Sequence, residues 1–122
     1  MPATRESGDR GAVTVEAAIV LSALTVVLGL VLAAVTAMTG ELRCADAARE
    51  AARLIARGQL PLAEQVVAEL APPGARLSVE AGVGSVAVTV DAEPAGGLLP
   101  GIHLHAEAYA ALEPGVADAA AG

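Results

Sequence analysis

The longest pattern in the chain is an uncharged, largely apolar run from Ala17 to Met38. As a helix rising about 1.5 Å per residue, this run reaches roughly 33 Å, enough to cross a hydrocarbon layer of about 30 Å. Lipid offers the backbone no hydrogen-bonding partner, so such a segment has to be helical, and the hydroxyls of Ser22, Thr25 and Thr36 can bond to the preceding turn. The run therefore predicts a transmembrane helix over about residues 17–38.

A secretory signal peptide is the competing interpretation of this run. The apolar region of a signal peptide normally has about 7–15 residues, which is shorter than the run found here. Val35-Thr36-Ala37 nevertheless has the small side chains of a signal-peptidase site. A secreted protein that begins at Met38 is therefore the alternative.

Helix-forming residues continue beyond the run. Residues 41–57 are rich in strong helix formers, and Gly58 is a typical helix stop. Oppositely charged residues three apart can form surface ion pairs on this helix: Asp46 with Arg49, and Glu50 with Arg53. We therefore expect one long helix over residues 12–58 that contains the membrane segment.

Small residues recur at spacings of three and four along this predicted helix, which places them on one face. Inside the membrane segment they are Ala18, Ser22, Thr25, Gly29, Ala33 and Ala37, and the series continues with Gly40, Cys44, Ala48 and Ala51. In lipid, small side chains let helix backbones approach closely, so this stripe predicts helix packing. An alanine-rich chain also produces such stripes by chance, and both interpretations stay open.

Residues 59–113 have the pattern of one short helix followed by three strands. Leu60 to Leu70 has helical periodicity, with Pro61 suited to the first turn. Apolar residues then alternate in three segments separated by links rich in glycine and proline. The predicted inward positions are Leu77 and Val79; Val86, Val88 and Val90; and Ile102, Leu104, Ala106, Ala108 and Ala110.

The predicted fold class is α+β. It combines a long N-terminal helix with a transmembrane segment, a short second helix and a small three-stranded antiparallel β-sheet of the pilin-like kind. Three strands with one apolar face need a cover, which the two helices can supply. Residues 114–122 are small and are expected to form a disordered tail.

The composition argues against several classes of function. The net charge of −7 disfavours nucleic acid as a partner. Cys44 is the single cysteine, so it cannot form an intrachain disulfide. It fits a small apolar position on the helix, and a crosslink between two molecules is the alternative. His103 and His105 share a face of the last predicted strand, but Glu107 is the only further metal ligand near them. We expect no enzyme, cofactor, metal or small-molecule substrate, because no nucleophile–base pair or phosphate loop is evident.

Glu16 places a charge directly before the uncharged run, five residues after Gly11. An acid in the first turn of a helix is favoured by the helix dipole and can lie at the level of the lipid headgroups. Cleavage after Gly11 would instead create an ammonium group on Ala12, which could pair with Glu16 of a neighbouring subunit. Glycine suits such a cut because a peptidase can approach a backbone without a Cβ, although it equally suits a flexible joint.

These residues resemble the TadE family of minor pilins or pseudopilins, which belong to tight-adherence (Flp-type) type IV pilus systems. The resemblance rests on the segment GAVTVEAA at residues 11–18, on the apolar run, and on the segment ADAAREAAR at residues 45–53. It covers about the first half of the chain. It implies that residues 1–11 are a leader that a prepilin peptidase removes after Gly11, with Ala12 as the new N-terminus and Glu16 as the assembly acid.

The resemblance also implies partners and a location. The partners would be the prepilin peptidase, other pilin subunits, the pilus assembly platform and membrane lipid. The protein would cross the cell (inner) membrane once, with an extracytoplasmic domain, and would join an extracellular pilus for adhesion or secretion. A small secreted or membrane-anchored extracytoplasmic binding protein is the alternative function.

Counting arginines on the two sides of the run gives the opposite orientation. Arg5 and Arg10 precede the run. More arginines follow it: Arg43, Arg49, Arg53 and Arg57. Because the positive-inside rule counts basic residues and largely ignores acids, it would place the C-terminal side in the cytoplasm.

Overall fold

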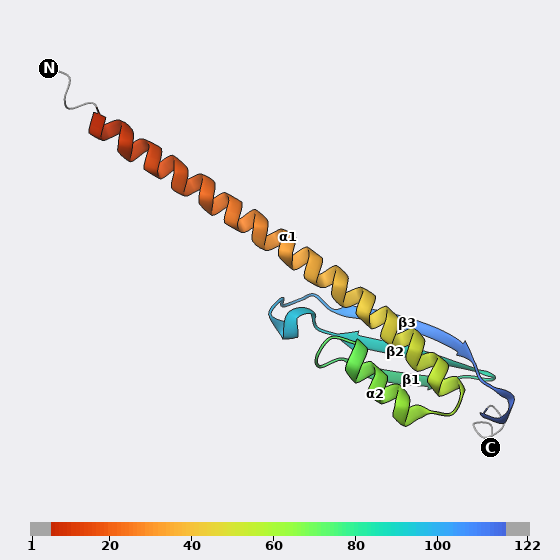
Figure 1. The fold of residues 1–122 in the computed structure, drawn as a ribbon. Coiled ribbons are helices and arrows are strands. Elements are labelled where there is room, and N and C mark those ends of the chain that lie inside the picture. Colours follow the sequence, from red (N-terminus) through yellow and green to blue (C-terminus); the bar gives the residue numbers. More distant parts are fainter. Residues whose placement is uncertain (1–5, 117–122) are drawn as a thin grey trace. The chain divides into compact units, whose positions relative to one another are not determined.

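A computed structural model describes residues 6–116 of the chain (Figure 1). Its elements follow in the order α1 (Glu6–Ala56), α2 (Leu60–Leu70), β1 (Arg76–Ala81), β2 (Ser85–Ala92), the short 3-10 helix η1 (Pro94–Gly97) and β3 (Leu104–Ala111). The α+β class, with two helices and a three-stranded antiparallel sheet, is thus confirmed. The chain divides into two compact units, the first ending at Ala34 and the second beginning at Val35.

The described part of the first unit consists of helix α1 up to Ala34. Every side chain of residues 8–32 is exposed, including Leu24 at 61% and Leu30 at 66%. By length and composition, α1 contains a stretch that could cross a membrane. The hydroxyls of Ser22 and Thr25 donate to the carbonyl oxygens of the preceding turn, at 2.7 and 2.8 Å, as predicted. The helix therefore satisfies its own polar groups and presents only apolar side chains and bonded hydroxyls between residues 17 and 34.

Helix α1 begins earlier than the sequence predicted, at Glu6 rather than near Ala12. The dipole of a helix favours acidic side chains near its N-terminus, and Asp9 supplies one. The helix ends at Ala56, after which Gly58 adopts a positive φ of 78°. Glycine reaches this left-handed conformation without the steric cost that a Cβ imposes.

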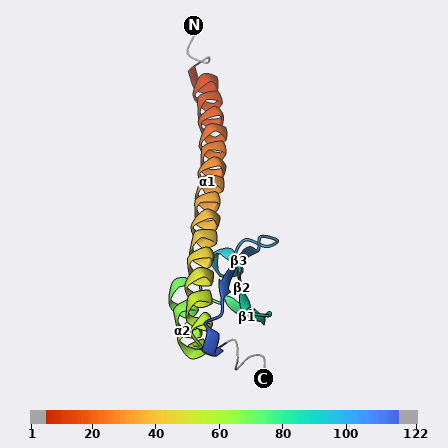
Figure 2. The same cartoon turned by 90° about the vertical axis from the view of Figure 1, so that its right-hand side faces the viewer.

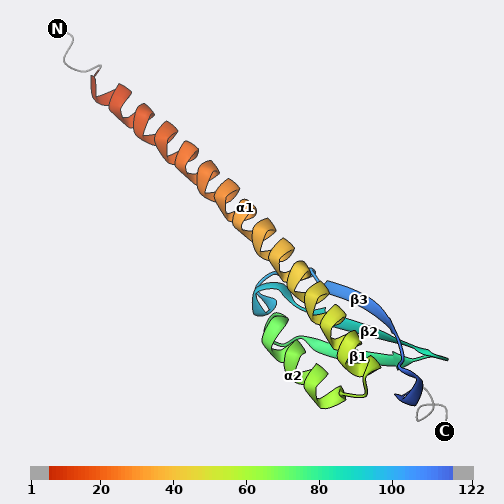
Figure 3. The same ribbon diagram turned by 45° about the vertical axis from the view of Figure 1, so that its right-hand side comes forward.

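The second unit, here called the sheet domain, contains two layers. Strands β1, β2 and β3 pair antiparallel in that order, so that Val88 faces Val79 on one side and Ala108 on the other. The last turns of α1 and all of α2 lie against one face of this sheet (Figures 2 and 3). The predicted cover of the apolar face is therefore confirmed.

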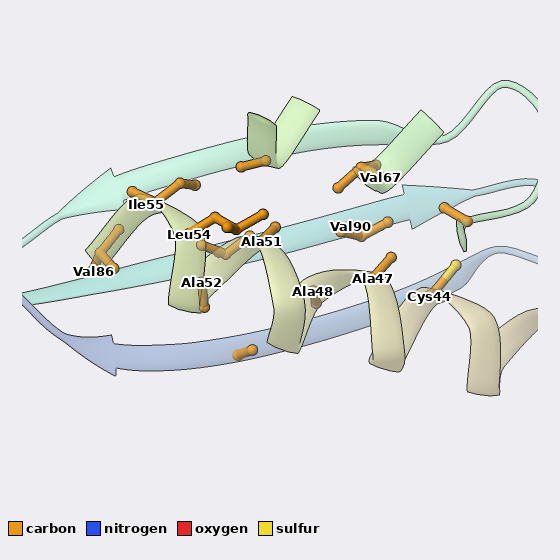
Figure 4. Close-up of a cluster of buried hydrophobic side chains, with 14 of the residues drawn as sticks. Cys44, Ala47, Ala48, Ala51, Ala52, Leu54, Ile55, Val67, Val86 and Val90 are labelled. Atoms are coloured by element: carbon orange, nitrogen blue, oxygen red, sulfur yellow. The ribbon is translucent and has the colours of Figure 1, made fainter. Parts of the chain in front are cut away.

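The core of the sheet domain is built from small side chains on α1 and valines on β2 (Figure 4). Cys44, Ala47, Ala48 and Ala51 are completely buried, and so are the strand residues that they meet, with Val88 at 0% exposure. Alternate residues of β2 are buried along its whole length, as the period of two predicted. The Cys44–Ala51 part of the small-residue stripe thus packs on the chain's own sheet.

Helix α1 and the sheet approach each other very closely at Gly40. A Cβ on Gly40 would lie 2.5 Å from Cδ1 of Leu104, the first residue of β3. Leu104 is only 2% exposed, so its side chain has little room to move away. Glycine at this position therefore lets the helix and the strand meet.

Three details differ from the sequence-based expectations. Val79, predicted to face inward, is 39% exposed, on the edge strand β1, which has no fully buried residue. Ile102, predicted to begin the inward face of the third strand, is 43% exposed, because the strand begins only at Leu104 and Gly101 before it turns with a φ of 83°. Residues 114–116, predicted to be disordered, have a helical backbone. The rest of that predicted tail lies outside the described residues.

Replacing Gly40 with leucine should destabilise the sheet domain. The larger side chain has to displace Leu104, and overpacking of this kind costs about 1–3 kcal/mol. A denaturant titration of the full chain in detergent, followed by chemical modification of the buried Cys44 thiol, measures the loss. Gly29→Leu is the matched control, since a Cβ added at Gly29 would meet no atom within 4 Å, and it should leave the midpoint unchanged. Equal midpoints for the two variants would contradict the packing account.

Candidate processing and assembly site

Gly11, Ala12 and Glu16 all lie on α1, near its beginning. A Cβ added to Gly11 would meet nothing within 4 Å, and the flanking Val13 and Val15 are 64% and 60% exposed. The site is therefore open to an enzyme from every side of the helix. The bond between Gly11 and Ala12 is helical in the structure, so a peptidase would have to unwind it locally. Glycine lowers the cost of that step by about 1 kcal/mol relative to alanine.

Glu16 is exposed, and within residues 6–116 its carboxylate has no hydrogen-bond or ion-pair partner. The hydroxyl of Thr14, two residues earlier, donates to the carbonyl oxygen of Arg10 at 2.8 Å and is not available to the acid. Ala12 and Glu16 are four residues apart and thus lie on the same side of the helix. The arrangement leaves the carboxylate ready for a partner that comes from a new amino terminus or from another molecule.

The predicted helix-packing stripe divides into two parts in the structure. Ala18, Ser22, Thr25 and Gly29 are exposed, while Ala33 and Ala37 are half-buried. The later members of the stripe, from Gly40 onwards, are buried under the sheet. The sequence did not reveal this division, because small residues on a helix suit a sheet of the same chain as well as a second helix.

Local ion pairs on α1 follow the predicted spacing. Arg49 lies 3.6 Å from Asp46, and Arg53 lies 3.6 Å from Glu50, with the side chains largely exposed. Pairs of this kind contribute little to stability. They keep this side of the helix polar and leave the opposite side to the core.

Longer-range polar contacts join the end of α1 to the rest of the sheet domain. The Nε group of Arg43 donates to the carbonyl oxygen of Leu70 at the end of α2, at 3.0 Å, and Arg57 lies 3.7 Å from Glu113. Sequence reasoning did not find these contacts, because each joins segments that only the folded chain brings together. They link α1 to the end of α2, and the segment after α1 to the segment after β3.

The outward face of the sheet is polar. Asp91 on β2 and His105 on β3 are register partners, and their Oδ1 and Nδ1 atoms lie 2.7 Å apart. The hydrogen bond with Asp91 raises the pKa of His105 above its ordinary value. The hydroxyl of Tyr109 donates to Glu107 at 2.6 Å, and this bond raises the pKa of the tyrosine. The sequence did not predict the pairing of His105 with Asp91, although the period of two places both residues on the outward face of the sheet.

Among residues 6–116, no group of three or more histidine, cysteine and acidic side chains could hold a metal ion. Cys44 is buried against the sheet, and this burial raises the pKa of its thiol, an effect to which the charges of Asp91 and Glu41 add. The thiol is therefore protonated and unreactive at neutral pH.

The fold and this site together define a small α+β protein whose N-terminal helix is long and apolar enough to cross a membrane. The chain is 44% identical, over 101 residues, to the Mycobacterium tuberculosis (strain ATCC 25618 / H37Rv) protein named apoptosis inhibitor Rv3655c. The match covers 83% of this chain and 79% of that protein, so the chain belongs to the family of the mycobacterial protein. No protein-family model and no solved structure matches the chain.

Replacing Asp91 with asparagine should lower the pKa of His105, because the variant lacks the carboxylate that accepts the hydrogen bond from the imidazolium. Since the folded-state pKa is raised, the pair stabilises the fold below about pH 6.5, and this contribution disappears as the pH rises through the folded-state pKa. An NMR titration of the imidazole protons, assigned with His105→Ala, measures the shift. An unchanged titration in Asp91→Asn would contradict the pairing.

Proposed function

We propose that this protein is a pilin-like subunit, similar to the TadE minor pilins, that is stored in the membrane and used to assemble a filament for adhesion or secretion. One observation supports the proposal above the others. Gly11, Glu16 and an exposed uncharged stretch occur together on a single helix, whose other end is already committed to the chain's own sheet. The part of α1 before the sheet domain is thus left for lipid and for other subunits.

Glu16 has a chemical role in this proposal. An unpaired charge inside the hydrocarbon layer costs roughly 2.5–3.5 kcal/mol, so a carboxylate at the edge of the layer gains from a positively charged partner. Cleavage after Gly11 creates that partner as the ammonium group of Ala12. When the subunit leaves the membrane and enters a filament, the carboxylate of one subunit and the ammonium of its neighbour fix how far one helix is displaced along the other.

The exposed part of the stripe has a packing role. Ala18, Ser22, Thr25 and Gly29 carry small side chains, so a neighbouring helix can approach the backbone along them. The larger residues around them, such as Leu21 and Leu28, then fill the space between helices in the filament or contact lipid before assembly. The prepilin peptidase, the assembly platform and other pilin subunits are the partners that this role requires.

A second candidate function follows from the mycobacterial relative, whose name describes an inhibitor of apoptosis. A chain with that activity would have to reach a host cell, and release of the sheet domain after a signal-peptidase cut near Met38 would provide a route. The α1–sheet contact does not decide against this route. The cut would fall before Gly40 and Cys44, so the released chain would keep the residues of α1 that pack on the sheet.

The intact mass of the protein extracted from its own cell envelope tests the proposal. The expected mature chain begins at Ala12, with or without a methyl group on its amine. A chain that begins at Met38 would support secretion and would contradict the pilin proposal. A chain that still begins at Met1 would contradict processing after Gly11 and would indicate a simple membrane anchor.

Replacing Glu16 with alanine should abolish incorporation into filaments while cleavage after Gly11 continues. The variant loses the proposed partner of the new ammonium group but keeps the glycine and the apolar helix that the peptidase contacts. Glu41→Ala removes an exposed carboxylate from the same helix beyond the uncharged run, and this matched control should assemble normally. Immunoblots of sheared surface filaments and of membranes measure assembly and processing separately. Normal assembly of Glu16→Ala would refute the role of the carboxylate.

A further inference from the structure

The end of the uncharged run lies beside two proline-containing loops of the sheet domain. Val35, Thr36 and Thr39 of α1 line a cavity of about 480 Å³ together with Pro73, which follows α2, and Pro94, which follows β2. The first charge after the run is Glu41. If residues 17–38 fill the hydrocarbon layer, this last uncharged turn lies at the membrane surface, and the two loops lie at the same depth.

The longer of these loops, residues 93–103 between β2 and β3, has an apolar tip. Leu98 is 82% exposed and Ile102 is 43% exposed, and no charged residue lies between them. Gly97 and Gly101 have φ values of 89° and 83°, so the tip is bounded by two turns that glycine alone adopts easily. Exposed leucine and isoleucine at the end of a loop have no packing role in the sheet domain itself.

Polar residues form a rim behind this tip. An open cavity of about 490 Å³ is lined by Arg76, Glu93 and His103, among others, all of them exposed at the same end of the sheet. Arg76 and Glu93 thus place charges of both signs at the end of the sheet where the β2–β3 loop lies. An apolar tip next to polar and charged residues suits the boundary between acyl chains and headgroups in a lipid layer.

We propose that the β2–β3 loop inserts Leu98 and Ile102 into the surface of the membrane that α1 crosses, as a second contact between the sheet domain and lipid. The inference rests on the membrane anchorage in the proposed function, but not on pilus assembly. A lipid surface fits the tip better than a protein partner does. The tip holds only aliphatic residues, glycine and proline, and lacks the tryptophan, tyrosine and arginine that anchor protein interfaces.

The opposite end of the sheet supplies an internal control. Val83, in the hairpin between β1 and β2, is fully exposed, and β2 separates it from the β2–β3 loop. The strand has 8 residues, which corresponds to about 26 Å at 3.3 Å per residue. A loop beside the end of the uncharged run and a hairpin at the far end of the same strand are therefore present in one molecule.

Single-tryptophan fluorescence tests the inference, because the natural chain has no tryptophan. Full-length Leu98→Trp and Val83→Trp are reconstituted into phosphatidylcholine–phosphatidylglycerol vesicles with or without brominated acyl chains. Leu98→Trp should emit at shorter wavelength than Val83→Trp and should be quenched several-fold more by the brominated lipid. Val83→Trp should be quenched instead by acrylamide in the water.

Two further measurements separate the ways in which the inference can fail. Flotation of the vesicles reports anchorage, and protection of the buried Cys44 thiol reports folding of each variant. A folded Leu98→Trp chain that floats with vesicles but is quenched no more than Val83→Trp overturns loop insertion and leaves anchorage intact. A folded chain that does not float overturns both.

Adding Leu98→Asp to an Ile102→Trp chain should reduce its quenching by brominated lipid, and unchanged strong quenching would contradict insertion through Leu98.

Discussion

Close contact between the small-residue side of α1 and the sheet is the interaction on which the rest of the structure depends. The chain has a single aromatic residue, the exposed Tyr109, so no bulky ring fills a wide gap and the core has to form by close approach. Gly40 and the alanines after Cys44 allow that approach, and β2 supplies a row of fully buried valines. A bulky residue on this side of the helix would separate the layers and open the core.

Helix α1 has two kinds of surface along its length. From Ala17 to Leu32 its apolar side chains are exposed on all sides, and each leucine, isoleucine or valine there favours lipid by about 0.3–0.6 kcal/mol. From Gly40 it has one buried side and one charged side. The change of surface occurs within a few residues, and it coincides with the position of the proline-containing loops beside Val35 and Thr39. Sheet packing, the proposed membrane anchorage and the proposed loop insertion all depend on this one change in helix chemistry.

Much of the fold could be predicted from the sequence, since its signals are local. The period of two identified Val86, Val88 and Val90 as inward-facing, and the spacing of Asp46 and Arg49 identified an ion pair. The start of β3 was placed too early, because alternation continues through Ile102 while the backbone turns at Gly101. The alternation of apolar residues carries no information about a positive φ.

The parts of the candidate site that depend on register or on distant segments could not be predicted. The pairing of Asp91 with His105 requires the register between β2 and β3, and the contact of Gly40 with Leu104 requires the docking of α1 on the sheet. Gly11 and Glu16 could be named as candidates because their spacing before the uncharged run is visible in the sequence, and their role stays a prediction. The sequence could not show that the sheet covers only the second half of the small-residue stripe, because that burial depends on how α1 packs on the sheet.

Amide hydrogen exchange of the full-length protein in lipid vesicles tests the central claim most directly, namely that α1 lies in lipid up to about Met38 and against the sheet after it. The account predicts that the amides of residues 17–38 exchange much more slowly than those on the exposed side of α2, because water cannot reach them. The exposed side chains of this part of α1 provide no other protection. Exchange of residues 17–38 as fast as on α2 would contradict the account.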